Sequence, residues 1–380
     1  MECYLDNSAT TRMDEEAAAL MQKLMLSDYG NPSSLHRKGF EAEGYVRDAA
    51  KTFAGILRCD PSEICFTSGG TESNNAAIIG AALANKRRGN RIITTRLEHA
   101  SVSSPVHFLT EQGFEASYLD ADSRGSIDLS QLERLLSDDV ILVSVMHVNN
   151  EIGSLLPIEE IGKLIQKKQS SCLFHVDDVQ GFGKLSLIPK NACIDLLSAS
   201  SHKLHGPKGA GLLYISSRTK LSPILFGGGQ QKGRRSGTEN VPGIAGFALA
   251  AGKMYGRLEE NYKHMEALKD LLLSELQDLE GITRNGGDVP YIISLSVKGV
   301  RSEVLLHALE DRGVYVSAGS ACSSNKPSVS AVLKAISVPE EALSSTIRIS
   351  LCPGNTEEEI RYAAGCMREI IPRLRKFVRK

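Results

Sequence analysis

Short runs of β-branched and other apolar residues recur between residues 63 and 215, separated by stretches with helical periodicity such as residues 158–169. This alternation is typical of parallel strands that are joined by crossover helices. It predicts an α/β core. The expected strands span residues 63–67, 91–95, 140–146, 173–176, 194–197 and 211–215.

The last part of the chain has a different pattern. Residues 243–279 are helical and charged, and they predict one long connecting helix. Beyond it, apolar runs at 292–297, 314–316 and 346–350 predict strands, and residues 356–378 predict a final helix. We therefore expect two domains in these 380 residues: a large one over residues 14–250, and a smaller α+β one formed by residues 1–13 and 251–380.

Composition limits the possible functions. The formal net charge is −1, so the charge balance gives no electrostatic case for direct binding of nucleic acid. The first residues lack the pattern of a signal peptide and no apolar run is as long as a membrane span, so we expect a cytoplasmic protein. The 8 cysteines form no Cys-x-x-Cys pair, which argues against a disulfide framework and a zinc ribbon, and we expect no metal site.

One lysine is distinguished by its surroundings. Lys203 follows the apolar run 194–197 and lies among the hydroxyls, a histidine and the glycines of residues 198–209. A lysine held after a buried strand is partly desolvated, which lowers its pKa and frees its amine for Schiff-base chemistry. This suggests pyridoxal 5′-phosphate (PLP) as a cofactor. A solvated lysine in a surface loop is the alternative.

Two other motifs suit such a cofactor. The sequence Ser-Gly-Gly-Thr at 68–71 follows an expected strand and opens a helix, where exposed amides bind phosphate, although Ser and Thr are also simple helix caps. Asp177 and Asp178 follow strand 173–176, at the end where ligands of open α/β sheets collect. A carboxylate there could keep a pyridine nitrogen protonated. A capping or salt-bridged aspartate is the alternative, and we prefer it for Asp178.

Three single residues have both a functional and a structural interpretation. His99 lies just past a strand end and suits stacking on a flat ring or moving protons, unless it is a structural histidine. Arg348, inside a short apolar strand, suits either a grip on a substrate carboxylate or an internal ion pair. Cys322 lies among small polar residues with a lysine nearby, which are conditions for a reactive thiolate.

Taken in order, these motifs resemble those of the cysteine desulfurases of the NifS and IscS type. That family belongs to the class V aminotransferases, which are fold-type I PLP enzymes. The resemblance covers nearly the whole chain and rests on residues 4–11, 30–36, 66–75, 147–153, 176–180, 201–203, 235–238, 319–322 and 348–351. It implies a fold-type I PLP-dependent transferase with a large, mainly parallel-sheet domain and a smaller α+β domain that carries a catalytic cysteine loop at residues 317–330.

The resemblance also implies a role for each matching residue that would hold the cofactor. Lys203 would bind PLP covalently and later carry a proton, while His99 would stack on the ring and assist proton transfer. Asp177 would pair with the ring nitrogen, and Gln180 and Asn150 would bind the side of the ring that carries the oxygen. The phosphate would be held by Gly70, Thr71, Ser200 and His202, and by Thr238 of a neighbouring subunit, so a homodimer is expected.

The implied substrate is L-cysteine. Arg348, with Asn31 near it and Asn150, would bind the substrate carboxylate. Cys322 would attack the substrate sulfur and become a persulfide, and L-alanine would leave. The persulfide would then pass to a sulfur-acceptor protein, either an iron–sulfur scaffold or a tRNA-thiolation enzyme.

The chain departs from the family pattern at several positions. Ser8 and Gly70 stand where alanine is common, and Asp178 stands where a small residue is usual. These three would tune the cofactor. Gln231 replaces a frequent glutamate, and Cys352 replaces a common glycine. Cys352 would be structural or a secondary sulfur carrier.

Two other functions remain open from the sequence. The first is a selenocysteine lyase or another PLP-dependent lyase or aminotransferase. A selenium-specific enzyme need not depend on its cysteine, because selenium leaves more readily than sulfur. The second is a catalytically silent sulfur-relay scaffold, which the intact Lys203, Asp177, His99 and Cys322 argue against.

Overall fold

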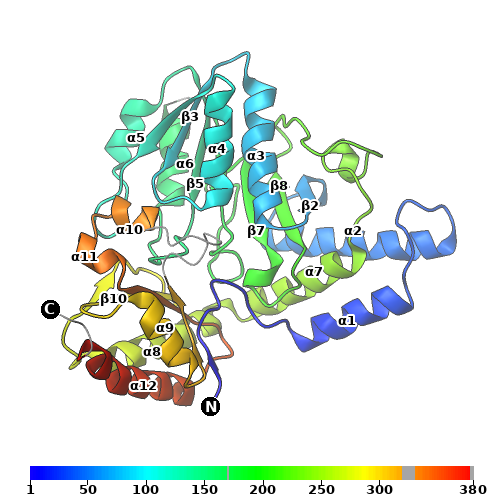
Figure 1. Cartoon of the computed structure of the whole chain (residues 1–380). Coiled ribbons are helices and arrows are strands. Elements are labelled where there is room, and N and C mark those ends of the chain that lie inside the picture. The colour runs from blue at the N-terminus through cyan, green and yellow to red at the C-terminus, as the bar shows by residue number, and fades with distance from the viewer. Residues whose placement is uncertain (169–170, 319–329, 377–380) are drawn as a thin grey trace.

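Among residues 1–168, 171–318 and 330–376, which the computed structural model describes, a seven-stranded sheet forms the centre of the larger part of the molecule (Figure 1). The strand order is β2-β8-β7-β6-β5-β3-β4. The strands are β2 (Ile64–Thr67), β3 (Arg91–Thr95), β4 (Glu115–Leu119), β5 (Val140–Met146), β6 (Leu173–Asp177), β7 (Leu196–Ser200) and β8 (Gly211–Ile215).

This sheet confirms the α/β prediction and corrects three details of it. β8 runs antiparallel to both of its neighbours, β2 and β7, whereas the repeating pattern predicts parallel strands. β7 begins at Leu196 rather than at residue 194. The sequence prediction lacks β4, because most of its residues are only half-buried or exposed at the edge of the sheet and form no apolar run.

Helices cover both faces of the sheet, as Figure 1 shows. α3 and α4 pack on one face, where Ile78 and Val102 are buried with Leu142 of β5. α2, α6 and α7 cover the other face around Phe53 and Phe247, whose ring centroids lie 4.6 Å apart. The helices of this part are α1 (Glu15–Leu26), α2 (Arg37–Leu57), α3 (Gly70–Asn85), α4 (Ala100–Glu111), α5 (Leu129–Leu135), α6 (Ile158–Lys167) and α7 (Val241–Gly256).

The strand directions bring the sequence motifs together. β7, β6, β5, β3 and β4 are parallel, and β2 points the same way because it and β7 are both antiparallel to β8. The carboxyl ends of these strands therefore meet at one edge of the sheet. The segments at the ends of β2, β3, β5, β6 and β7 carry most of the predicted site residues, and these segments all start from this edge.

In the described part of the chain, a four-stranded antiparallel sheet of order β12-β13-β10-β9 forms the centre of a smaller part. Leu268, Leu295, Ile347 and Met367 belong to its own apolar core. Its elements are α8 (Leu258–Leu276), β9 (Ile282–Asn285), β10 (Ile292–Val297), α9 (Ser302–Glu310), β11 (Val314–Tyr315), β12 (Ser317–Ala318), α10 (Ala331–Ala335), α11 (Glu340–Leu343), β13 (Thr346–Ser350) and α12 (Glu357–Arg375).

Two helices replace the single long helix predicted for residues 243–279. α7 ends at Gly256 and α8 begins at Leu258, because Arg257 between them has φ −129° and ψ 27°, which are not helical. The final helix α12 begins after Thr356, whose side chain and that of Glu359 form a capping box. Its predicted last residues, 377 and 378, lie outside the described residues.

The N-terminal segment links the two parts (Figure 1). β1 (Cys3–Tyr4) pairs in parallel with β11, and Asp6 bridges to Ser350 of β13. A few residues later, the Thr11 N–H donates to the carbonyl of His202 at 2.9 Å. Residues 6–11 thus run from the smaller sheet to the loop after β7. No described helix combines the length and apolar character that a membrane crossing requires.

Candidate active site

A cavity of about 280 Å³ lies at the carboxyl edge of the large sheet. It is lined by residues from the loops after β2, β3, β5, β6 and β7, by Ser8 and Ala9 of the N-terminal segment, and by Arg348 of β13. The predicted site residues that line it are Gly70, Thr71, His99, Asn150, Asp177, Gln180, Ser200, His202, Lys203 and Arg348. Residues widely separated in sequence therefore meet in one place.

Lys203 is held by the N-terminal segment. It ends the short 3-10 helix Ser201–Lys203 that follows β7. Its Nζ donates hydrogen bonds to the backbone carbonyls of Ser8 at 2.6 Å and Ala9 at 2.7 Å. These two contacts hold the amine at a fixed point in the cavity wall. Because Lys203 binds the backbone carbonyl of Ser8, this contact does not depend on which side chain stands at position 8.

Asp177 is a buried carboxylate at the end of β6. Its Oδ2 accepts a hydrogen bond from Asn74 Nδ2 at 2.7 Å, and its Oδ1 accepts one from the Val179 N–H at 3.0 Å. Burial raises the pKa of Asp177, while these hydrogen bonds and the nearby His99 oppose the rise. Such a carboxyl shares a proton readily with a base placed in the cavity.

His99 is held in one tautomer. It is the N-cap residue of α4, and its Nδ1 accepts a hydrogen bond from the Ser101 N–H at 3.1 Å. In the neutral ring the proton therefore lies on Nε2. Burial lowers the pKa of His99, although the carboxylate of Asp177 opposes this shift. His99 is expected to be a neutral hydrogen-bond donor at neutral pH.

Gly69, Gly70 and Thr71 at the start of α3, together with Ser200, form a site with open hydrogen-bonding groups, which we call the cradle. Its N-cap, Gly69, has φ +153° and supplies no side-chain cap for the first amides of the helix. Ser200 Oγ is buried nearby and has no hydrogen-bond partner among the described residues. A Cβ on Gly70 would lie 2.6 Å from Val179 Cγ2, so the backbone of α3 can pack this closely only with glycine there. Together these groups suit a bound anion.

His202 completes this end of the cavity. Its Nδ1 lies 3.2 Å from Thr10 Oγ1. Burial and the nearby lysines, Lys203 first, lower the pKa of His202 to about 4. At neutral pH it is therefore an uncharged ring that can donate one hydrogen bond.

Arg348 forms the internal ion pair that is one of its two interpretations, and its contact with a substrate carboxylate stays a prediction. Its guanidinium pairs with Asp6 at 2.8 Å and donates to the Asn150 carbonyl at 2.9 Å. Its Nε is buried and has no hydrogen-bond partner among the described residues. The side chain also lines the cavity, so the internal ion pair orients a cation that faces the site.

Several predicted residues lie elsewhere. Asn31 and Thr238 are exposed and do not line this cavity in the single chain. Their roles stay predictions. Cys322 lies outside the described residues, as do the other residues of the expected catalytic loop between 319 and 329.

Several residues that shape the site have no role that the sequence predicts. Asn74 contacts Asp177, and Ser101 holds His99; Asn74 lies one helical turn after Gly70, so helical spacing was the available signal. Glu98 is also buried: it accepts hydrogen bonds from Thr95 Oγ1 at 2.7 Å and the Met146 N–H at 3.0 Å. Burial raises the pKa of Glu98 to about 8.

The residues that depart from the family pattern have local partners. Asp178 Oδ1 lies 2.6 Å from His147 Nδ1 in a buried pair, as the salt-bridge interpretation predicts. Cys352 is part-buried and its backbone N–H donates to Asn355 Oδ1. Burial raises the pKa of Cys352, which disfavours its thiolate.

Comparison with known proteins agrees with this geometry. Residues 3–362 match the aminotransferase class-V family. The chain belongs to the class-V aminotransferase family. Within this family it is 42% identical to a cysteine desulfurase IscS of Vibrio vulnificus over 380 residues, covering 98% of this chain and 93% of that protein.

Two solved structures have the same fold as this chain. A NifS-like protein matches with a TM-score of 0.92 and 39% identity, covering 98% of this chain and all of that one (100%). SspA in complex with cysteine matches with a TM-score of 0.81 and 32% identity, covering 93% of this chain and 100% of that chain.

We predict that His99 stays neutral at pH 7 and titrates below its ordinary pKa of 6.5. Burial destabilises the cation, so protonation requires a lower pH. Nitrogen NMR of histidine-labelled protein, with His99→Gln for assignment, would show the proton on Nε2. A pKa above the ordinary value, or a proton on Nδ1, would contradict this description of the site.

Proposed function

We propose that this chain is a PLP-dependent cysteine desulfurase, which converts L-cysteine to L-alanine and retains the sulfur as a persulfide on Cys322. The observation that carries the proposal is the convergence of Lys203, Asp177, His99 and Arg348 on one cavity. The names of the similar proteins support the activity, and the SspA structure with cysteine supports the substrate.

The described residues fit PLP. The cavity of about 280 Å³ is near the lower end of the range for small-ligand sites. At one end, the open amides of α3, the unpartnered Ser200 Oγ and Thr71 suit a phosphate. At another, Asp177 supplies the carboxylate that a protonated pyridine nitrogen needs, and Lys203 supplies the amine. Donors and acceptors of the right kind are therefore present for each polar group of the cofactor.

When bound, PLP withdraws electrons from the carbon atoms of an attached amino acid and so weakens the C–S bond. Asp177 would hold a proton at the ring nitrogen, because its carboxyl is buried and oriented by Asn74. Gln180 Nε2 donates to the Ser8 carbonyl at 3.0 Å, which orients its amide in the cavity wall beside Asn150. His99 would place a neutral ring against the cofactor, and Lys203 would accept and return a proton.

The substrate carboxylate is assigned to Arg348. The ion pair with Asp6 orients a guanidinium that lines the cavity, and hydrogen bonds to a charged partner are stronger than neutral ones. Asn150 lines the same part of the cavity wall, and Asn31 is proposed as a further contact.

The thiol of Cys322 attacks the substrate sulfur. An S–S bond forms, the C–S bond of the substrate breaks, and the carbon takes up a proton, so L-cysteine and an enzyme thiol give L-alanine and an enzyme persulfide. A thiolate is the reactive form of the nucleophile. The persulfide then passes to an acceptor protein, which we propose to be an iron–sulfur scaffold or a tRNA-thiolation enzyme. A reducing compartment such as the cytoplasm suits a free thiol of this kind.

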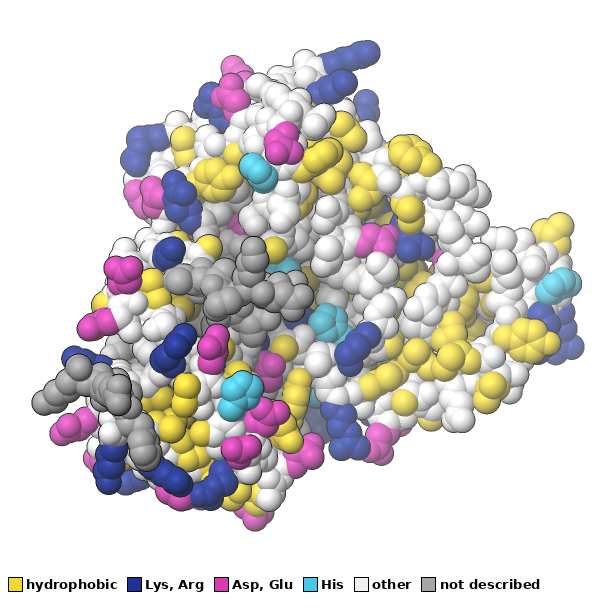
Figure 2. All heavy atoms as spheres, in the orientation of Figure 1, with side chains coloured by type: hydrophobic (Ala, Val, Ile, Leu, Met, Phe, Trp, Pro, Cys, Tyr) yellow, Lys and Arg dark blue, Asp and Glu magenta, His cyan; other side chains and the backbone are white. Residues whose placement is uncertain are grey.

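We also propose that two copies of this chain form the working enzyme. Large apolar side chains are exposed along residues 25–40, namely Met25, Leu26, Tyr29, Leu35 and Phe40. Figure 2 shows apolar side chains gathered over this region, at the right, where α1 and α2 lie in Figure 1. Exposed apolar patches of this kind mark association surfaces. Thr238 would then contribute to the phosphate site of the second copy.

The chain is proposed to work as two domains, residues 14–250 and residues 1–13 with 251–380. The separate apolar cores around Phe247 and around Ile347 support this division. The cavity lies where the two cores approach each other, because Arg348 of β13 lines it together with the loops of the large sheet.

Purified enzyme given L-cysteine and a reductant is expected to release alanine and sulfide in equal amounts. Cys322→Ala should lose both products while it keeps the visible absorption of bound PLP, because the nucleophile is removed and the cofactor site is not. Cys352→Ala is the matched control and should keep its activity, since burial disfavours its thiolate. Alanine formation by the wild-type enzyme from selenocysteine but not from L-cysteine would favour the selenocysteine lyase instead.

Gly70→Ala is expected to weaken PLP binding by about 1–3 kcal/mol, because the new methyl group overlaps Val179 Cγ2. Val179→Ala in the same protein removes the overlap and should restore most of the affinity. Equilibrium dialysis against PLP measures both effects. If Gly70→Ala bound PLP as well as the wild type, the close packing of α3 on Val179 would have no part in holding the cofactor.

A further inference from the structure

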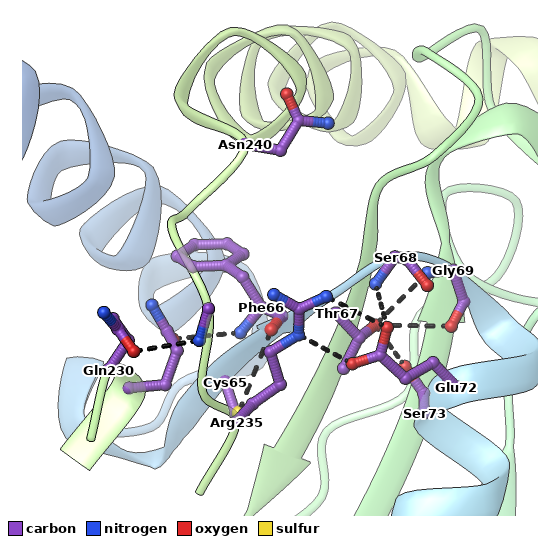
Figure 3. A network of polar contacts seen from close by, with 12 residues as sticks. Cys65, Phe66, Thr67, Ser68, Gly69, Glu72, Ser73, Gln230, Arg235 and Asn240 are labelled. Atoms are coloured by element: carbon purple, nitrogen blue, oxygen red, sulfur yellow. Dashed lines mark hydrogen bonds and ion pairs between the residues drawn. The ribbon is translucent and has the colours of Figure 1, made fainter. Parts of the chain in front are cut away.

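The loop that carries Thr238 is fastened to the first turn of α3 by an arginine–carboxylate pair. Arg235 Nε lies 2.8 Å from Glu72 Oε1, and its Nη2 lies 3.3 Å from Glu72 Oε2. The same Oε2 accepts a hydrogen bond from the Ser68 N–H at 2.9 Å. Figure 3 shows Arg235 reaching from its loop to Glu72 on the helix. A two-point contact of this kind fixes orientation as well as distance.

This ion pair is partly shielded from solvent. The side chains of Arg235 and Glu72 are only 23% and 18% exposed. Burial alone would raise the pKa of Glu72, yet the hydrogen bonds from Arg235 and Ser68 bring it below its ordinary value. Glu72 is therefore charged at neutral pH, and the pair is screened less by salt than an exposed one.

Two glutamines, Gln230 and Gln231, fix the conformation of the loop that carries Thr238. Gln231 Oε1 accepts from the Phe66 N–H of β2 at 3.1 Å, and its Nε2 donates to Glu239 Oε1 at 2.8 Å. Gln230 Oε1 accepts from the Gly237 N–H at 2.8 Å. These contacts lie on both sides of Thr238 in sequence, and Thr238 itself is exposed and outside the cavity of its own chain.

We propose that the Glu72–Arg235 pair is a positioning device that couples the phosphate cradle of one copy of the chain to the phosphate cradle of a second copy. The inference rests on the proposed function. Gly70 and Thr71, which line the cradle of this chain, are the residues directly before Glu72 in α3. The same turn of helix thus holds the phosphate of its own site and sets the position of the Thr238 loop offered to the other site.

This arrangement has a thermodynamic consequence. Phosphate bound in the cradle orders the first turn of α3, and the ordered turn holds the loop in the position that a second copy requires. By linkage, pairing of two copies strengthens phosphate binding by the same factor. Cofactor loading and dimer formation therefore support each other, and Glu72 and Arg235 transmit the effect without touching the cofactor.

The first experiment compares Arg235→Gln with Arg234→Gln. Arg234 is the matched control, because it lies in the same loop but donates to the Ser62 carbonyl rather than to α3. Equilibrium dialysis of the full-chain protein measures affinity for PLP and for pyridoxal, which lacks the phosphate. Arg235→Gln should bind PLP about tenfold more weakly and pyridoxal as the wild type does, which is the loss expected for one charge-assisted contact. Arg234→Gln should change neither affinity.

Glu72→Gln should have the same effect as Arg235→Gln, and the double variant should lose no more than either single one, because all three lack the same interaction. Equal losses for PLP and pyridoxal, no loss for PLP, or additive losses would each overturn the proposal, since they would reduce the pair to a general stabilising contact.

The second experiment uses mixed dimers to ask which site the loop serves. In one dimer, Lys203→Ala is in one copy and Arg235→Gln in the other. The only site with Lys203 then receives an intact loop, and it should bind PLP more tightly than the corresponding site of the second mixed dimer, although its own α3 has lost the pair. In the other dimer, both substitutions are in one copy and the second copy is wild type. Its lysine-bearing site receives the altered loop and should bind PLP about tenfold more weakly.

The reverse pattern, or the same affinity in both mixed dimers, would overturn the coupling between copies. A wild-type protein that stayed monomeric with PLP bound would overturn it too. These results differ from a failure of the proposed function, in which the wild-type protein would not bind PLP through Lys203 at all.

Discussion

The rest of the site depends on a carboxylate buried at the end of β6. Burying a charge without compensation is costly, so Asp177 is surrounded by groups from three other segments: Asn74 of α3, the Val179 N–H, and His99 at the start of α4. Its pKa is nevertheless raised by burial, which leaves the carboxyl able to share a proton. A protonated pyridine nitrogen would supply the missing positive charge. The buried carboxylate of Asp177 is thus favoured by a positive charge in the cavity, and the proposed cofactor would supply that charge.

The sequence was sufficient to predict the part of the site that follows the strands of the large sheet. Lys203, Asp177 and His99 each come just after an apolar run, and parallel strands bring such positions to one edge. Contacts across long stretches of chain could not be predicted this way. Lys203 Nζ binds the Ser8 carbonyl 195 residues away, and the antiparallel direction of β8 is defined by its pairing with β7, which the local pattern does not indicate.

The departures from the family pattern are accommodated in pairs of neighbouring residues. Gly70 leaves the space that Val179 Cγ2 fills, and Asp178 lies against His147 in a buried contact. The Val179 methyl group fills the space beside Gly70, and His147 gives the buried Asp178 carboxylate a partner. Each neighbour thus makes the residue compatible with the fold. Gly70 and Val179 both line the cavity, so their contact shapes its wall, whereas Asp178 and His147 are not among the lining residues.

The most direct test of the account is to find the lysine that binds PLP. Lys184 is the instructive rival, because it is buried, unlike the half-buried Lys203, and burial lowers its pKa to about 7. Reduction of the PLP-loaded enzyme with borohydride, followed by peptide mapping with mass spectrometry, makes the attachment permanent and locates it. The account predicts a phosphopyridoxyl group on Lys203 alone. A label on Lys184, or none on the chain after loading with PLP, would contradict it.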